Sequence, residues 1–367
     1  MGDNVISGKP VAKENKPNIT IREAIRADND GLVLLTSLTP MKGDISIRID
    51  RKPDFFRLLE MRGQSFVVVA EVNNRIIGSS SASAVVVFID GQPETVFYLG
   101  DFKIHPDYRR STVAMRIGRV VLQKLESLNA DLLFCTVAYG NDAVLPFVKG
   151  RAFLPPAEEA GIFHVFQIIP TPFKTSNTKY QLEEGSFTSS GLGFFNSYMK
   201  KFQFGHIYSE SSFNNSILIT ASFQGRLVAA ISLVDTMEAK QNVLIRMPFY
   251  MKSIVKAIGA INTIFMVMRL PEIDRAVRIL YIKSFACEPG YAEAIKLLLG
   301  RARNVAYEKG YTFLSVGIHA KDPFLKLFSG YPKFTFKSMG FVASLKGSKD
   351  KIQSILRGIP FEDYSLV

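Results

Sequence analysis

The stretch LGDFKIHPDYRRSTVAMRIGRVVLQKL, residues 99–125, predicts a strand that runs through a short loop into a long helix. Pro106 ends the strand, because proline has no N–H to donate to a sheet ladder. The first backbone N–H groups of a helix lack internal partners and lie at the positive end of its dipole. With Arg109 and Arg110 beside them, this helix start predicts a phosphate site, and a solvated arginine cap is the alternative. Apolar residues recur along the helix at Val113, Ile117, Val120, Val121 and Leu125.

A weak internal repeat extends on both sides of this stretch. Residues 67–80 (VVVAEVNNRIIGSS) and 217–230 (ILITASFQGRLVAA) each indicate two strands joined by a two-residue turn. Asn and Gly at these turns tolerate the positive φ that tight hairpins require. Residues 281–291 (YIKSFACEPGY) repeat the strand and the proline of residues 99–108, and another strand follows the helix in each copy. Matching blocks in the same order indicate a tandem duplication.

The repeat divides the chain into segments, and the second copy carries an insert at about 236–274. We expect this Met-rich insert to form an additional core helix, with a substrate lid or a homodimer face as the alternatives. Its methionines are Met237, Met247, Met251, Met266 and Met268. The predicted segments are a disordered N-terminus (1–18), the first copy (19–170), a Ser-, Thr-, Gly- and Pro-rich linker (171–200), the second copy (201–345) and a C-terminal helix and tail (346–367).

Composition and charge narrow the possible functions. The 367 residues are 47% hydrophobic and 21% charged, which excludes a chain that is disordered throughout. Cys135, Cys287 and the histidines lack metal-ligand spacing, which excludes a cysteine-based zinc site and argues against a secreted disulfide scaffold. Residues 1–18 contain no apolar core of signal-peptide length, so a cytoplasmic location is expected. The net charge of +12 falls almost entirely on residues 171–367, without a stripe of lysines. A solvated basic surface is therefore favoured over a nucleic-acid interface, and the most apolar stretch, 254–268, is too short for a membrane span.

The run His105-Pro106-Asp107-Tyr108-Arg109, followed by a helix that starts on small residues, resembles motif A of the GCN5-related N-acetyltransferases (GNAT). That family holds the pyrophosphate of acetyl-CoA on the signature Arg/Gln-x-x-Gly-x-Gly/Ala. Arg109 and Ala114 match this signature, and Thr112 stands where the family has Gly. The resemblance covers residues 19–169 and extends more faintly over 201–345. It implies an α+β fold of two acetyltransferase-like domains, each a mixed, mostly antiparallel sheet flanked by helices.

The resemblance also implies roles for individual residues. Asp101 stands where the family has a carboxylate that deprotonates the amine, and a strand-end carboxylate paired with an Arg is the alternative. The family's Tyr that protonates the leaving thiolate falls on Val148, and Tyr139 is the candidate substitute. Asn141 matches the Asn that opens the next helix of the family. The residues implied in cofactor binding are Phe102, Lys103, Ile104, Arg109, Arg110, Ser111, Thr112, Val113, Ala114 and Asn141.

The second copy departs further from the signature. Ser284 replaces the carboxylate, and Ala292 and Glu293 replace the two arginines. A carboxylate repels phosphate, since two unit charges 4 Å apart oppose each other by roughly 1–4 kcal/mol. We therefore expect the second copy to shape the substrate site or the fold without binding CoA at this position.

Together these patterns predict a cytoplasmic, acyl-CoA-dependent N-acyltransferase. The resemblance favours acetyl-CoA, with a longer acyl-CoA as the alternative, and direct transfer to the amine of a small molecule or a peptide. The Met-rich insert favours a partly apolar acceptor, and the basic second half favours an anionic one. Two other classes remain open: a non-catalytic acyl-CoA binding or sensing module, and a basic interaction protein with an eroded acetyltransferase fold.

Overall fold

The computed structural model describes residues 18–40, 46–150, 154–174, 176, 179–185, 189–247, 249, 253 and 271–367. The N-terminus that we predicted to be disordered lies outside the described residues, apart from its last residue, and so does most of the Met-rich insert. Of the five methionines in that insert, Met237 and Met247 are described. Its role as core helix, lid or dimer face stays a prediction.

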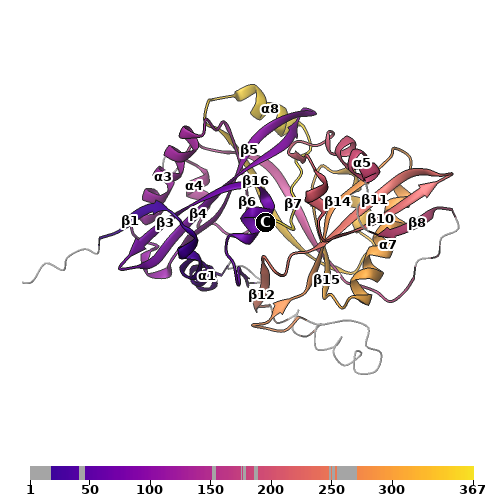
Figure 1. Cartoon of the computed structure of the whole chain (residues 1–367), viewed down its shortest axis with the longest axis horizontal. Coiled ribbons are helices and arrows are strands. Elements are labelled where there is room, and N and C mark those ends of the chain that lie inside the picture. The colour runs from indigo at the N-terminus through magenta and orange to yellow at the C-terminus, as the bar shows by residue number, and fades with distance from the viewer. Residues whose placement is uncertain are drawn as a thin grey trace, which may run out of the picture.

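The two halves of the chain repeat one order of strands and helices (Figure 1). The first half contains β1 (Thr20–Glu23), η1 (Arg26–Asp28), α1 (Asn29–Leu38), β2 (Ser46–Asp50), α2 (Arg57–Arg62), β3 (Gln64–Val72), β4 (Arg75–Ile89), β5 (Gln92–Ile104), η2 (Pro106–Tyr108), α3 (Val113–Ser127), β6 (Leu132–Ala138), α4 (Leu145–Val148) and β7 (Glu158–Ile168). The second half contains β8 (Gln181–Gly185), α5 (Ser189–Met199), β9 (Gly205–His206), η4 (Glu210–Phe213), β10 (Ser216–Phe223), β11 (Arg226–Asp235), β12 (Gln241–Arg246), β13 (Ala276–Val277), β14 (Ile279–Cys287), α7 (Ala292–Glu308), β15 (Phe313–His319), η5 (Pro323–Phe328), β16 (Lys333–Ser344) and α8 (Lys349–Arg357).

Both predicted hairpins are present. The turn between β3 and β4 has Asn73 and Asn74 at φ 48° and 61°, and the turn between β10 and β11 has Gln224 and Gly225 at φ 52° and 77°. Two consecutive positive φ values match the right-handed twist of the flanking strands, which is why these residue types occur there. The tandem repeat therefore rests on equivalent local structure in each half.

The halves exchange their last strands. The first half's β6 pairs with β16 of the second, and the second half's β15 pairs with β7 of the first. Strands β7 and β16 also pair with each other, so the described strands form one continuous 13-stranded sheet. Among these strands, β5–β6 and β14–β15 are the parallel pairs, and the others run antiparallel. This confirms the predicted α+β fold of two acetyltransferase-like halves, and the exchange makes each half depend on the other.

The linker that we predicted over 171–200 is shorter in the structure. Residues 181–185 form β8, which extends the sheet by pairing with β10, and residues 189–199 form α5. Phe195 and Met199 of α5 are fully buried in the core of the second half. The small polar residues of this segment suggested a linker, but tertiary packing overrode that local preference.

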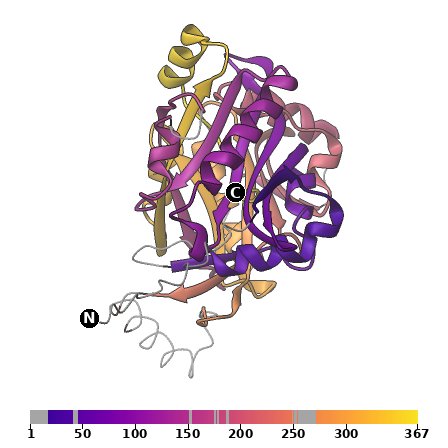
Figure 2. The same cartoon turned by 90° about the vertical axis from the view of Figure 1, so that its left-hand side faces the viewer.

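Alternating residues of β3 build a different helix layer on each face of the sheet. Val68 and Ala70 pack with α3, whereas Val67 and Val69 pack with α1 and α2. Successive side chains of a strand point to opposite faces, so α3 covers one face and α1 and α2 cover the other (Figure 2). Any passage between the strands of this sheet therefore connects two different environments.

Two further elements hold the halves together. Strand β2 pairs with β12, which also pairs with β13 in a small separate sheet. After α8 the chain returns between the halves, and its last residues lie near the centre of the molecule (Figure 1). There the Nζ of Lys240 donates to the carbonyl oxygen of Tyr364 at 2.8 Å and to the main-chain oxygen of Val367 at 2.6 Å. Within the described residues, no helix has both the length and the apolar character that crossing a bilayer needs.

Candidate active site

A gap opens in the sheet where β5 and β6 diverge. The two strands pair only from Val96–Tyr98 to Leu132–Phe134, and beyond these residues no pairing joins them. On its other edge β5 bulges away from β4, because Lys103 pairs with Ser79 but Gly100 pairs with Ser81. Asp101 lies in this bulge at φ 47°, a strained value for a residue with a side chain. The divergence of β5 and β6 therefore leaves residues 99–104 without partners on β6, and residues 99–103 line the gap.

The gap is a cavity of about 270 Å³ that passes through the sheet. On the α3 face, which we call the donor chamber, its lining is apolar: Leu99, Ile117, Val121, Leu133, Leu154, Ala157 and Ala343. On the α1 and α2 face, which we call the acceptor chamber, it is lined by Thr36, Ile49, Arg51, Leu58, Leu59, Arg62, Asp101, Lys103, Leu366 and Val367. The cavity thus connects an apolar compartment with a charged one.

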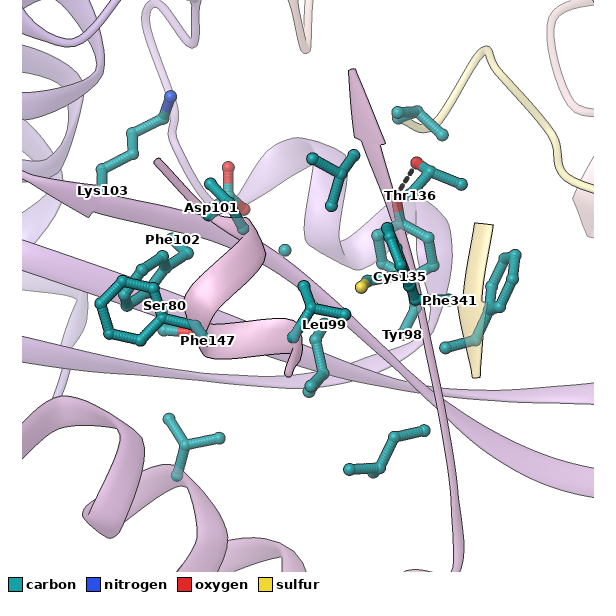
Figure 3. Close-up of a pocket in the computed structure, with 18 of the residues that line it drawn as sticks. Ser80, Tyr98, Leu99, Asp101, Phe102, Lys103, Cys135, Thr136, Phe147 and Phe341 are labelled. Carbon is teal, nitrogen blue, oxygen red and sulfur yellow. Dashed lines mark hydrogen bonds between the residues drawn. The ribbon is translucent and has the colours of Figure 1, made fainter. Parts of the chain in front are cut away.

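Asp101 contributes the carboxylate of the acceptor chamber (Figure 3). Its Oδ1 accepts from Nη1 of Arg51 at 3.0 Å, and its Oδ2 accepts from the hydroxyl of Ser81 at 3.0 Å. Burial by itself would raise the pKa of Asp101, but the charges of Arg51 and Lys103 and the Ser81 hydrogen bond outweigh it and lower the pKa. The carboxylate is therefore charged at neutral pH, as the alternative of a paired strand-end carboxylate also expected.

Three cations surround this carboxylate. Arg51 is buried and also donates to the carbonyl oxygen of Phe55 at 2.6 Å. Arg62 at the end of α2 stacks 3.8 Å from the centre of the Tyr98 ring and donates to the carbonyl oxygen of Leu366. Burial lowers the pKa of Lys103, although Asp101 opposes that shift. Lys103 is half-buried and makes no hydrogen bond or ion pair within the described part of the chain.

The loop before α3 carries the predicted phosphate site. Arg109, Arg110, Ser111 and Thr112 are exposed, and among the described residues neither arginine forms an ion pair. Thr112 is the N-cap residue of α3, and its side chain makes no capping hydrogen bond. The N–H of Val113 donates to Oγ of Ser111 at 3.3 Å. The next N–H groups of α3 have no acceptor within the helix, and the two guanidinium groups precede them, which suits an anion. Val113 and Ala114 are buried and anchor the helix start on the sheet.

The remaining predicted residues divide between cavity and surface. Phe102, Lys103 and Asn141 line the cavity, and the Phe102 ring packs on Phe147 of α4 with ring centres 4.9 Å apart. Ile104 packs against the core near α3 instead. Tyr139 is 68% exposed and lies outside the cavity lining, a position that does not favour a role as proton donor to a thiolate in the gap.

Two histidines make structural contacts outside the lining of this cavity. His105 is buried at the loop, where its Nε2 lies 2.6 Å from a nitrogen of Arg75. His319 contacts the carbonyl oxygen of Ala160 at 3.0 Å, and burial lowers its pKa to about 4. Within the described residues, no group of three His, Cys, Asp or Glu side chains is arranged to hold a metal ion.

Sequence reasoning missed the residues that close the acceptor chamber. Arg51 and Arg62 precede the hairpin and belong to no motif, and Leu366 is 304 positions from the arginine that binds its carbonyl oxygen. Only the fold brings these groups together. The available signal was the helical spacing of Phe55, Leu58 and Leu59, which indicates a buried helix but says nothing of Arg62.

In the second half, the equivalent gap between β14 and β15 is filled. These strands pair from Ile279–Tyr281 to Phe313–Ser315 and then diverge, as β5 and β6 do. The C-terminal tail occupies the space: Pro360, Phe361 and Glu362 leave a cavity of only about 10 Å³ beside Phe285 and Gly317. The ring of Tyr364 covers Gly317, where a Cβ would overlap it. Glu293 at the start of α7 is paired with Lys179 at 3.4 Å.

Comparison with known proteins agrees with this geometry. Residues 37–153 match the model of the acetyltransferase (GNAT) family. Comparison with curated proteins gives no match. The first half of the chain thus contains a region that matches the GNAT family, and the whole chain has the fold of a tandem GNAT protein.

The solved structures that resemble the chain do so across nearly its full length. N-myristoyltransferase of Saccharomyces cerevisiae with bound myristoyl-CoA has a TM-score of 0.60 at 10% identity, covering 93% of this chain and 89% of that one. A GCN5-related N-acetyltransferase from Anabaena variabilis has a TM-score of 0.52 at 10% identity, covering 89% and 72%. A probable N-acyltransferase from Enterococcus faecalis has a TM-score of 0.52 at 11% identity, covering 92% and 74%. At these identities the likeness concerns the fold.

Proposed function

We propose that this protein is an acyl-CoA-dependent N-acyltransferase with one active site, in the first half. The observation that carries the proposal is the cavity that passes through the sheet at the bulge of Asp101. The exposed loop at the start of α3 follows the same strand. The unpaired edge of β5 suits the amide groups of a pantetheine arm, and the N–H groups of α3 with Arg109 and Arg110 suit the pyrophosphate. An acyl-CoA bound in this way supplies an activated thioester within the gap.

The two chambers suggest how transfer proceeds. The amine enters from the acceptor chamber, where the charged Asp101 attracts its ammonium form and orients water that accepts its proton. The neutral nitrogen then forms the amide bond as the carbon–sulfur bond breaks, and CoA leaves as a thiolate that takes up a proton. A free N–H of β5 stabilises the negative charge that develops on the carbonyl oxygen. A thiolate leaves readily, so Val148 in the Tyr position weakens catalysis without preventing it.

The donor chamber supports an acyl group longer than acetyl. Its lining is apolar, and the whole cavity of about 270 Å³ exceeds an apolar cavity of about 150 Å³ that accommodates benzene. Each buried methylene contributes about 0.8 kcal/mol, so a chain of several carbons gains affinity over acetyl. The sequence favoured acetyl-CoA because of the family resemblance. The structural neighbour with bound myristoyl-CoA supports the longer alternative.

Calorimetric titration with acetyl-CoA, octanoyl-CoA and CoA tests this function, followed by a transfer assay over a panel of amines. We expect one site per chain, at least tenfold tighter binding of octanoyl-CoA than of acetyl-CoA, and amide product with some amines. Failure of all three ligands to bind at millimolar concentration would contradict the proposal. Equal affinities for acetyl-CoA and octanoyl-CoA would agree with an acyltransferase but would contradict the preference for a longer acyl group.

A second candidate is an acyl-CoA binding module without transferase activity. It is favoured by the exposed position of Tyr139 and by Val148 in the family's Tyr position. The thiol of Cys135, which lines the cavity, is no replacement acid, because burial raises its pKa to about 12. Tight binding of octanoyl-CoA without product from any amine would select this candidate.

A further inference from the structure

The acceptor chamber holds more positive than negative charge. Arg51 and Asp101 pair with each other, which leaves Arg62 and Lys103 without a carboxylate partner among the described residues. Asp50 lies near Lys103 but is itself bound by Arg48 at 2.7 Å. The main-chain oxygen of Val367 in the same chamber is occupied by Lys240. Two cations of the chamber are therefore held in no ion pair within the described residues, and Asp101 is the carboxylate that they share with Arg51.

Burial makes this arrangement costly without a ligand. A cation that leaves water needs a counter-charge or hydrogen-bond acceptors to offset the lost hydration. Lys103 makes no ion pair or hydrogen bond within the described part of the chain, and burial lowers its pKa even though Asp101 lies nearby. Arg62 has one acceptor, the carbonyl oxygen of Leu366, and stacks on Tyr98, so part of its guanidinium remains available. Both cations line the same chamber and act on Asp101, so an anionic group bound there would supply the counter-charge that they lack.

Asp101 and Lys103 extend to the same side of β5, whereas Phe102 packs toward α4 (Figure 3). One carboxylate and one cation separated by a single residue match a ligand that carries an amine and an anion close together. The charges that matter lie in the first half, which is nearly neutral overall, and not in the basic second half. The net charge suggested an anionic acceptor, and the chamber is the specific place in the first half where its anionic group would bind.

We propose that the acceptor is an amine that also carries a carboxylate, of the amino-acid class. Arg62 and Lys103 bind the carboxylate, and Asp101 faces the ammonium group. This inference rests on the proposed function, because it names the acceptor of the same site. The apolar neighbours Ile49, Leu58 and Leu59 favour an apolar side chain on that amino acid.

The direct test compares L-leucine with L-leucinamide as acceptors in the transfer assay with octanoyl-CoA. The amide has the less basic amine, so uncatalysed chemistry at neutral pH favours it, and a preference for leucine must come from the protein. We expect kcat/KM for leucine to exceed that for leucinamide by at least tenfold. Equal values, or a preference for leucinamide, would overturn the proposal. A preference for phosphoethanolamine over leucine would replace the carboxylate by a phosphate.

Variants locate the effect. Lys103→Met removes the charge with little change of shape, and Arg62→Gln is the second variant because Arg62 also contacts the tail. Each should lower the ratio of kcat/KM for leucine to kcat/KM for leucinamide at least tenfold. The matched control is Lys309→Met, an exposed lysine at the end of α7, which should keep the preference. An unchanged preference in both chamber variants would contradict the assignment of these residues.

Binding separates this inference from the proposed function. If no amine is acylated, calorimetric titration of L-leucine and L-leucinamide into the protein saturated with octanoyl-CoA still reports on the chamber. Leucine binding that Lys103→Met weakens tenfold would support the carboxylate site in a protein without transferase activity. If neither amine binds, the inference is overturned, whatever the affinity for octanoyl-CoA.

Discussion

The two gaps of this molecule arise from one topology and differ in what fills them. In the first half, β5 and β6 diverge around a cavity of about 270 Å³, with arginines before the adjoining helix. In the second half, β14 and β15 diverge around about 10 Å³, because the C-terminal tail occupies the space and Glu293 stands at the helix start. The strand arrangement alone therefore does not make a binding site. What distinguishes the halves is the charge at the helix start and the segment that enters the gap.

The largest predicted effect is a loss of stability when the side chain of Tyr364, which fills part of the second gap, is removed. Tyr364 is buried against Gly317 and Phe163, and its hydroxyl contacts that of Ser338. Tyr364→Ala should lower the free energy of unfolding by about 4 kcal/mol through the cavity it leaves, measured by urea denaturation. Tyr364→Phe, which keeps the ring, should cost about 1 kcal/mol. If the alanine variant bound a second equivalent of octanoyl-CoA, the second gap would be a blocked site and not a structural one.

Reversing charge at the two helix starts should separate the halves by ligand affinity. Arg109→Glu should weaken octanoyl-CoA binding at least 100-fold, because it removes one attraction to the pyrophosphate and adds one repulsion. Glu293→Lys should leave affinity within twofold. Calorimetry at low and moderate salt measures both variants. Equal losses would mean that both halves contribute to one phosphate site, against the single-half account.

The tail also carries a group that should make stability depend on pH. Burial raises the pKa of Glu362 to about 8, and Arg62 and Lys240 offset only part of that shift. The folded state thus holds a proton that the unfolded state releases near pH 4.5, so this group's contribution to stability falls as pH rises from 4.5 to 8. Glu362→Gln should remove this fall and raise the free energy of unfolding at pH 9 by about 2 kcal/mol.

The control for this prediction is Glu159→Gln, an exposed glutamate on β7. The difference in unfolding free energy between wild type and each variant is followed from pH 5 to pH 9. It should grow with pH for Glu362→Gln and stay flat for the control. A difference for Glu362→Gln that does not change with pH would mean that Glu362 is ionised in the folded protein.

The smallest predicted effect concerns the departure from the GNAT signature. Thr112 caps α3 without using its hydroxyl, so glycine there costs only a few tenths of a kcal/mol in stability. Thr112→Gly allows the backbone to approach the pyrophosphate more closely and should tighten octanoyl-CoA binding about threefold. Thr112→Ala, which keeps a Cβ, should not. Weaker binding in both variants would show that the hydroxyl itself binds the ligand.

The sequence predicted what local chemistry determines. The turn residues Asn73 and Asn74 and the proline before α3 gave the hairpin and the loop, and the repeat gave the tandem fold. It did not predict the strand exchange between β7 and β16, because the alternation of polar and apolar residues along a strand does not specify which strand it pairs with. The acceptor chamber was also out of reach. It combines Arg51, Arg62 and Leu366, whose proximity depends on the complete fold.

Hydrogen–deuterium exchange with and without octanoyl-CoA tests the central claim most directly, namely that one acyl-CoA binds in the gap of the first half. The ligand should slow exchange at residues 100–104 of β5, 110–116 at the start of α3 and 135–138 of β6. Residues 282–296, the equivalent region of the second half, should exchange as before. Protection of residues 282–296 with none at 100–116 would place the acyl-CoA site in the second half and contradict this claim.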